Sequence, residues 1–290
     1  MKVLSFEGGF HGRSLGALSA TRSKAIHKLD FPAFDWPVLP FPANVFPLEE
    51  HAEENRAREA RVLSRVEDLL RTQDVAAVIV EPIQGEGGDR HASAEFFRGL
   101  RRLTLQYGTA FIADEVQTGG GGTGRWWRHE AWDLPEPPDL VTFSKKMQIG
   151  GYYCREAFHP AEPYRIFNTF LGDPLRTAQL GVIVETVERD GLLDYVAQVG
   201  ESLLSGLLSL TAKHPALLSA PRAAGTFAAI DCPDPGTRDR LLAAVRVRGL
   251  EMGGSGDRSI RFRPALILGE RHVQEALDLL EAGCRALGTP

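Results

Sequence analysis

Two side chains that could do chemistry each follow an apolar run of the chain. Asp114 ends the run Ala110–Ala113, and Lys145 closely follows the run Leu140–Phe143. Because the carboxyl ends of parallel strands meet at one edge of a sheet, both side chains are expected to face one crevice. A carboxylate that pairs with a ring nitrogen, and a lysine amine that condenses with an aldehyde, are what pyridoxal phosphate chemistry needs. Each residue alone also has a structural interpretation, as a helix cap, an arginine partner or a surface lysine, but together they predict a catalytic pair.

The segment Gly8–Arg13 follows the first apolar run and adds residues suited to a bound ring. Its glycines allow a cofactor to approach the backbone closely. Phe10 could stack on a flat ring, and Arg13 could hold a carboxylate with its planar guanidinium. The alternative is that Phe10 lies in the core, His11 bonds to backbone and Arg13 lies at the surface. The residues alone leave both interpretations open.

Two further segments carry charged side chains near predicted strand ends. Glu81–Gly88 ends an apolar run with two acids and a glycine-rich hinge. In Gly253–Pro264 the arginines alternate along a strand, so that Arg261 and Arg263 share one face. Both segments add charged groups to the predicted crevice.

Composition and spacing exclude several classes of function. The chain has 290 residues and a formal net charge of -5, which gives no general attraction for nucleic acid or an anionic membrane. Its apolar runs are too short to cross a bilayer. The three cysteines, Cys154, Cys232 and Cys284, form no CxxC pair, so neither a metal site nor a disulfide framework is predicted. Gly119–Gly124 contains the letters GxGxxG, but no helix start follows, so a dinucleotide site is not indicated.

Short apolar runs alternate with longer segments of helical period. Strands are predicted at 1–7, 75–80, 110–113, 140–143, 226–230 and 259–262, and helices at 49–71, 175–188, 192–213, 237–248 and 270–287. A further helix begins at its N-cap Ser93, and its apolar stripe is Phe96, Phe97, Leu100, Leu103 and Leu105. The proline-rich segment 31–47 cannot be a helix.

The order of these elements predicts an α/β fold. A strand, a helix and a strand in succession imply parallel pairing through right-handed crossovers. A mostly parallel sheet is expected in residues 1–174, and a smaller α+β unit in residues 175–290. The first run, Met1–Glu7, would need neighbours on both sides if it is a central strand, and nothing upstream supplies one.

Segments along nearly the whole chain resemble the class III, fold-type I aminotransferases, which use pyridoxal phosphate. The segments that carry the resemblance are Phe10–Arg13, Ser23–Lys28, Phe34–Pro37, Glu81–Gly88, Asp114–Gly122, Thr142–Met147, Tyr164–Thr169 and Ser259–Pro264. The resemblance is strongest to members that act on 4-aminobutyrate. It implies a large cofactor-binding domain with a smaller C-terminal domain, and transfer of the amino group of 4-aminobutyrate to 2-oxoglutarate, giving succinate semialdehyde and glutamate.

The resemblance also implies roles at the cofactor. Lys145 would carry the cofactor and move the proton at the substrate carbon, whereas its neighbour Lys146 would have no such role. Asp114 would keep the pyridine nitrogen protonated. The other implied cofactor-binding residues are Phe10 and Val116 on the two ring faces, Gln117 near the phenolic oxygen, His11, and Thr169, which would reach the cofactor phosphate of a partner subunit.

The substrate-binding residues implied by the resemblance are charged. Arg13 would take the substrate carboxylate, and Glu81 belongs to the same set. Glu86 and Arg261 would form an ion pair that stays closed for the amine donor and opens when 2-oxoglutarate brings a second carboxylate. A homodimer in the mitochondrial matrix is implied, with no nucleic acid or membrane partner.

The chain departs from the family pattern at Ile149, where a small or polar residue is usual, so packing beside the lysine is expected to differ. The N-terminal part of the family, with its phosphate-binding turn and the iron–sulfur cysteines of animal members, is expected to be missing. Weak cofactor binding and little activity are therefore predicted for the chain alone. The alternatives are another ω-amine donor, such as ornithine or β-alanine, and a shortened non-catalytic form.

Overall fold

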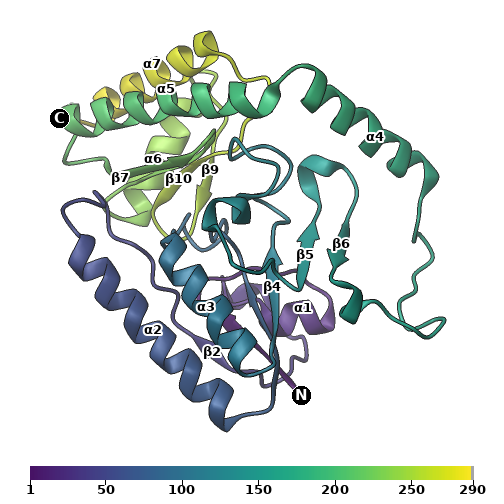
Figure 1. Ribbon diagram of the computed structural model, residues 1–290. Helices are drawn as coiled ribbons and strands as arrows, with labels where there is room; N and C mark the ends of the chain where they lie inside the picture. The colour runs from purple at the N-terminus through teal and green to yellow at the C-terminus, as the bar shows by residue number, and fades with distance from the viewer. Residues whose placement is uncertain (289–290) are drawn as a thin grey trace.

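The computed structural model describes residues 1–288 and contains two β-sheets with helices packed on them (Figure 1). The strands are β1 (Lys2–Phe6), β2 (Val38–Leu39), β3 (Val75–Val80), β4 (Ala110–Asp114), β5 (Leu140–Phe143), β6 (Gly151–Cys154), β7 (Ser219–Ala224), β8 (Phe227–Asp231), β9 (Gly253–Ser255) and β10 (Ser259–Phe262). The α-helices are α1 (Leu15–Ala20), α2 (Ala52–Thr72), α3 (Ala94–Gln106), α4 (Pro174–Arg189), α5 (Leu192–Lys213), α6 (Pro235–Arg246) and α7 (Glu270–Gly288).

The larger sheet has the strand order β2-β1-β3-β4-β5-β6. Its neighbouring strands pair in parallel except β5 and β6, which are antiparallel. This arrangement confirms the predicted α/β fold with a mostly parallel sheet. The carboxyl ends of β3, β4 and β5 lie at one edge, where the candidate site residues follow.

Helices α2 and α3 lie side by side on one face of this sheet (Figure 1). The predicted cap of α3 is confirmed, because the Ser93 hydroxyl accepts a hydrogen bond of 3.1 Å from the amide of Phe96. Phe96 and Leu100 are fully buried. Leu105 was wrongly included in the apolar stripe. It is 41% exposed, because five residues beyond Leu100 a helical side chain has rotated away from the core face.

Strand β1 has neighbours on both sides. Its partners are β3 and the two-residue strand β2, which comes from the proline-rich segment 31–47. Both neighbours of β1 therefore come from later segments of the chain.

The smaller sheet is antiparallel and has the order β7-β8-β10-β9. Helices α5, α6 and α7 bury its apolar face, with Leu207, Ile230 and Leu280 fully buried in this second core. Strand β10 matches the predicted bounds, whereas β7 has no counterpart among the predicted elements.

Helix α4 leads from the larger sheet to the smaller one and extends away from both (Figure 1). It begins at Pro174, where the predicted domain boundary falls; the division into two domains itself stays a prediction. Among residues 1–288, no helix is long and apolar enough to cross a membrane.

Candidate active site

Asp114 is the last residue of β4 and lies beside Thr142 of the neighbouring strand β5. Its side chain is buried. One oxygen, Oδ1, accepts hydrogen bonds from the Val116 amide at 3.1 Å and from the Thr142 hydroxyl at 3.0 Å. The other, Oδ2, lies 2.7 Å from Nδ1 of His11. Burial alone would raise the pKa of Asp114, but the His11 contact and these hydrogen bonds lower it below its ordinary value. The carboxylate therefore stays ionised.

The ring of His11 bonds to the Asp114 carboxylate, whereas the alternative interpretation was a bond to backbone. Burial favours a neutral imidazole, but the hydrogen bond to Asp114 and the negative charges of Asp114 and Glu81 raise the pKa of His11. Its other ring nitrogen, Nε2, is buried without a partner among the described residues. The Gly8–Arg13 segment thus contributes a hydrogen-bonding partner, the His11 ring, to the Asp114 carboxylate.

Glu81 directly follows β3 and accepts hydrogen bonds from two backbone segments. Its Oε1 accepts from the Phe10 amide at 2.8 Å, and its Oε2 accepts from the Gly85 amide at 3.1 Å. Burial raises the pKa of Glu81 to about 7, although the His11 charge opposes that shift. Glu81 therefore links two loops through its carboxylate, a role that the sequence did not indicate. Its substrate-binding role stays a prediction.

The two adjacent lysines after β5 have different surroundings. Lys146 donates from Nζ to the carbonyl of Pro264 at 2.6 Å, and burial and the charge of Arg263 lower its pKa. Lys145 is exposed and opens the 3-10 helix Lys145–Met147 with a φ of 48°, in the left-handed region that only a few per cent of non-glycine residues adopt. Such strained positions cluster at functional sites. The geometry therefore favours Lys145 over Lys146 as the available amine.

A cavity of about 520 Å³ lies between the two sheets, and Lys145 opens onto it. Its lining residues are Glu86, Gln117, Lys145, Lys146, Gln148, Arg261 and Arg263. Across it, Nη1 of Arg261 lies 2.6 Å from Oε1 of Glu86, and both side chains are about one quarter exposed. Burial opposes ionisation of Glu86, but the Arg261 contact and the charge of Lys145 hold its pKa below the ordinary value. The predicted ion pair is thus present, and its gating role stays a prediction.

Gln117 lines the same cavity. Its side-chain amide packs so closely on Gly85 that a Cβ on that glycine would come within 2.1 Å of its Oε1 atom. Its Oε1 accepts a hydrogen bond of 3.0 Å from Nε of Arg263. A side chain at position 85 would therefore displace the Gln117 amide, whose direction Arg263 fixes.

Phe10, Arg13 and Val116 surround the site less tightly. The Phe10 ring packs edge-on against His27, with ring centroids 5.2 Å apart. Arg13 is exposed, and its charge adds to burial in lowering the pKa of His27. Val116 is partly buried directly after the Asp114 strand. Neither Phe10 nor Arg13 lines the cavity, so their assigned contacts stay predictions.

Thr169 lies on the exposed segment between β6 and α4, at the right of Figure 1, and does not line the cavity. In the described part of a single chain it therefore does not join the site. The predicted contact with a partner subunit's cofactor is neither tested nor contradicted by this position.

Glu115 points away from Asp114 and anchors the turn that follows. Its carboxylate is fully buried and accepts from the backbone amide of His129 at 2.7 Å and from the Thr118 hydroxyl. No local pattern in the sequence predicts this role. Arg263 was noted only for sharing a face with Arg261, and Asp89, which pairs with it, carried no recognisable pattern.

The arrangement fits pyridoxal phosphate by the chemistry of its donor groups. An ionised carboxylate, which a protonated ring nitrogen requires, ends β4, and an exposed amine follows the adjacent strand β5. The amide of Gln117 and the Glu86–Arg261 pair lie in the region between the sheets. Among the described residues, no cluster of histidine, cysteine and acidic side chains could hold a metal ion.

Comparisons with known proteins agree with this chemistry. The family model described as Aminotransferase class-III matches residues 1–283. A 4-aminobutyrate aminotransferase of Dictyostelium discoideum is 50% identical over 289 residues, which are 99% of this chain and 58% of that protein. The mitochondrial 4-aminobutyrate aminotransferase of Homo sapiens is 50% identical over 282 residues, which are 96% of this chain and 56% of that protein.

A solved lysine aminotransferase from M. tuberculosis superposes with a TM-score of 0.94 at 34% sequence identity. The match covers 99% of this chain and 67% of that one. The chain thus spans a little over half the length of the two curated relatives described above.

Proposed function

Because the chain belongs to the class III aminotransferases and has the fold-type I architecture of their pyridoxal-phosphate-dependent members, we propose that it forms the catalytic part of such an enzyme. The observation that carries the proposal is the placement of an ionised Asp114 and an exposed Lys145 after adjacent parallel strands. When bound, pyridoxal phosphate supplies an electron sink for the bond-breaking step. The remaining tasks fall to side chains of this chain.

In this proposal Asp114 holds a proton on the ring nitrogen, and His11 keeps Asp114 ionised and correctly oriented. Lys145 would hold the cofactor through its amine and would move a proton at the substrate carbon, a task typical of a positioned general base. Phe10 and Val116 would cover the ring faces, and Gln117 would bind near the phenolic oxygen. Lys146 cannot substitute easily, because its amine already donates to the Pro264 carbonyl.

We propose 4-aminobutyrate as the amino donor and 2-oxoglutarate as the acceptor, giving succinate semialdehyde and glutamate. The support is the shared identity of 50% with relatives named 4-aminobutyrate aminotransferase. Arg13 would bind the carboxylate common to both substrates. The Glu86–Arg261 pair would stay closed over 4-aminobutyrate, and Arg261 would take the second carboxylate of 2-oxoglutarate.

The assembly and location are also proposals, because the chain spans little more than half of its curated relatives. A homodimer would let Thr169 reach a partner subunit's cofactor phosphate. Several relatives, among them those of Mus musculus and Homo sapiens, are named mitochondrial. We propose the same compartment for this protein.

A donor comparison tests the substrate. The expressed protein, supplied with pyridoxal phosphate and 2-oxoglutarate, is assayed for glutamate formation with 4-aminobutyrate, ornithine, β-alanine and lysine. Preference for 4-aminobutyrate supports the proposal. Turnover of another donor without 4-aminobutyrate refutes the substrate while leaving the class of reaction standing, and no cofactor binding at any concentration refutes the enzyme itself.

A further inference from the structure

The loop Gly85–Asp89 carries Glu86, one half of the ion pair at the cavity mouth, and the smaller sheet holds this loop at several points. Arg263, just after β10, has its guanidinium 3.3 Å from the ring centroid of Phe227 and is mostly buried. Its Nη2 pairs with Oδ1 of Asp89, whose side chain is 1% exposed, and its Nε donates to Gln117. The Arg263 side chain therefore connects Asp89, at the end of the loop, with Gln117, which lines the cavity.

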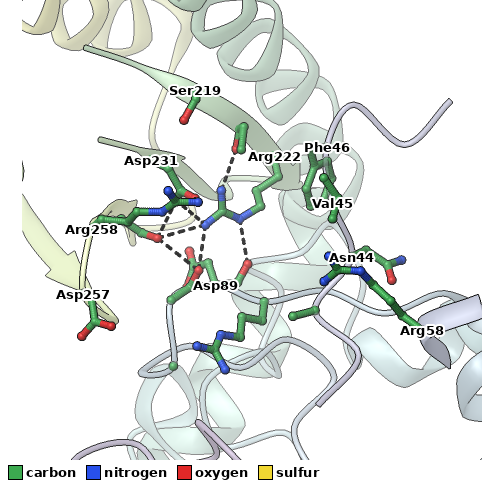
Figure 2. Close-up of a pocket in the computed structure, with 16 residues that line it drawn as sticks. Asn44, Val45, Phe46, Arg58, Asp89, Ser219, Arg222, Asp231, Asp257 and Arg258 are labelled. Atoms are coloured by element: carbon green, nitrogen blue, oxygen red, sulfur yellow. Dashed lines mark hydrogen bonds and ion pairs between the residues drawn. The ribbon is translucent and has the colours of Figure 1, made fainter. Parts of the chain in front are cut away.

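The backbone of the same loop is held by a second arginine. Figure 2 shows Arg222 of β7 pointing at the segment that carries Asp89. Its Nε donates to the carbonyl of Asp89 at 2.8 Å, and its Nη2 donates to the carbonyl of Gly88 at 2.7 Å. The amide of Gly88 donates to the Ser255 hydroxyl at 3.0 Å. Asp89 is thus held by its side chain through Arg263 and by its backbone through Arg222.

Arg261 has much weaker support, although it lies only two residues before Arg263. Its one ion pair among the described residues is with Glu86, and both partners are about one quarter exposed at the mouth of the cavity. The clearest difference lies in the carboxylates: Glu86 is about one quarter exposed, whereas Asp89 is 1% exposed, and losing the partner of a buried charge is far more costly than losing a contact that solvent reaches. The Glu86–Arg261 contact can therefore break while the Asp89–Arg263 contact persists.

We propose that Arg263 is a positioning residue that keeps Gln117 and the Gly85–Asp89 loop fixed to the smaller sheet, so that the Glu86–Arg261 pair opens by movement of Arg261 alone. This inference rests on the proposed function, in which that pair opens for a second carboxylate. Its consequence is that the two sheets stay together during both halves of the reaction. The choice between substrates with one and two carboxylates is then made by a single side chain.

The matched variants Arg263→Lys and Arg261→Lys test the inference. Lysine keeps the positive charge, but its single amine lacks the planar fork that bridges two partners. Amide hydrogen exchange is measured in peptides covering residues 84–90 and 115–119. We expect exchange at residues 84–90 to become about tenfold faster or more in Arg263→Lys, because the loop opens locally at lower cost. In Arg261→Lys we expect it to stay within about twofold of the parent.

Steady-state kinetics supply the second readout. Arg261→Lys is expected to raise KM for 2-oxoglutarate and leave KM for the amine donor unchanged. Arg263→Lys is expected to lower kcat in both half-reactions, because Gln117 loses its fixed direction. Equal exchange in both variants, or a KM effect confined to 2-oxoglutarate in Arg263→Lys, would overturn the inference.

Asp89→Asn gives an independent route if Arg263→Lys does not fold. Asparagine tolerates the left-handed φ of 50° at this position and removes only the charge. The same faster exchange at residues 84–90 is expected, and unchanged exchange would contradict the anchor. Since exchange requires no turnover, a protein without aminotransferase activity would refute the proposed function, while the exchange result alone would still decide whether Arg263 anchors the loop.

Discussion

Nδ1 of His11 lies 2.7 Å from Oδ2 of Asp114, and both side chains are buried. The carboxylate thus has a partner that can carry a positive charge, and two neutral donors, Val116 and Thr142, on its other oxygen. Without that partner, burial would favour protonation of Asp114. The His11 contact is therefore what keeps the proposed ring-nitrogen partner ionised.

The first prediction concerns the pH dependence of this pair. The folded pKa of His11 is raised above 6.5, so its stabilising contribution is fully present below 6.5 and is lost as pH rises through the folded value. The folded pKa of Asp114 is lowered, so its contribution is present above 3.8 and is lost only as pH falls through the folded value. The pair therefore stabilises the fold most between 3.8 and 6.5.

His11→Gln removes the charge and retains a donor. We expect the free energy of unfolding to fall by about 1.5–3 kcal/mol at pH near 6, the range for hydrogen bonds to charged groups. The difference from the parent should shrink at higher pH. Urea unfolding over a pH series measures it, with exposed His159→Gln as the control that changes little. A difference that grows with pH would contradict the assignment.

The second prediction concerns the buried ion pair between Arg101 and Asp139. Nη1 and Nη2 of the fully buried Arg101 lie 2.7 Å and 3.1 Å from the two Asp139 oxygens, and Asp139 also accepts from the Phe111 amide. Asp139→Asn leaves the buried guanidinium with only its longer contact to the Glu136 carboxylate, at 4.0 Å. We expect a loss of about 3–5 kcal/mol in the free energy of unfolding.

The control for this variant is Asp68→Asn, which breaks the exposed contact with Arg71 on α2. Its effect should stay below about 1 kcal/mol. Chemical denaturation of both variants under one condition gives the comparison. Equal effects would show that Arg101 gains solvent or another partner when Asp139 is neutral.

The third prediction concerns Glu86→Gln. Without the Glu86 carboxylate, Arg261 is free to take a second substrate carboxylate in either half-reaction. We expect the preference for glutamate over 4-aminobutyrate as amino donor to rise about tenfold, which corresponds to about 1.4 kcal/mol. Stability should change by less than about 1 kcal/mol, since the pair is partly exposed.

Single-turnover reactions of the cofactor-loaded protein with each amine measure this preference. Glu53→Gln on the exposed face of α2 serves as the control. An unchanged preference in Glu86→Gln would show that the ion pair does not determine the choice of substrate.

The central strands could be predicted because their sequences carry the signal locally. The runs Val75–Val80 and Ala110–Asp114 are almost wholly apolar, as expected when strands are buried in an α/β sheet. Edge strands lack that signal. Strand β7 contains Pro221 and Arg222, and β2 lies between prolines; both are edge strands, where proline costs no ladder hydrogen bond.

The features of the site also fall into two groups, residues near strand ends and contacts between distant segments. Asp114 and Lys145 could be predicted because each position follows directly from a strand end. The contacts of Arg263 with Gln117 and Asp89 join residues separated by 146 and 174 positions, and no local period encodes such contacts. Glu81 was recognised as an acid near a strand end, but its bonds to the Phe10 and Gly85 amides depend on how two loops meet.

The most direct test of the central claim, that Asp114 and Lys145 hold pyridoxal phosphate between them, is to locate the attached cofactor. The protein is incubated with pyridoxal phosphate, reduced with borohydride, digested and mapped by mass spectrometry, in parallel with Lys145→Ala, Lys146→Ala and Asp114→Asn. We predict a saturable label on Lys145 that is absent from Lys145→Ala, retained in Lys146→Ala and formed only at higher cofactor concentration in Asp114→Asn. A label on Lys146 or on scattered surface lysines, unaffected by Asp114→Asn, would contradict the account.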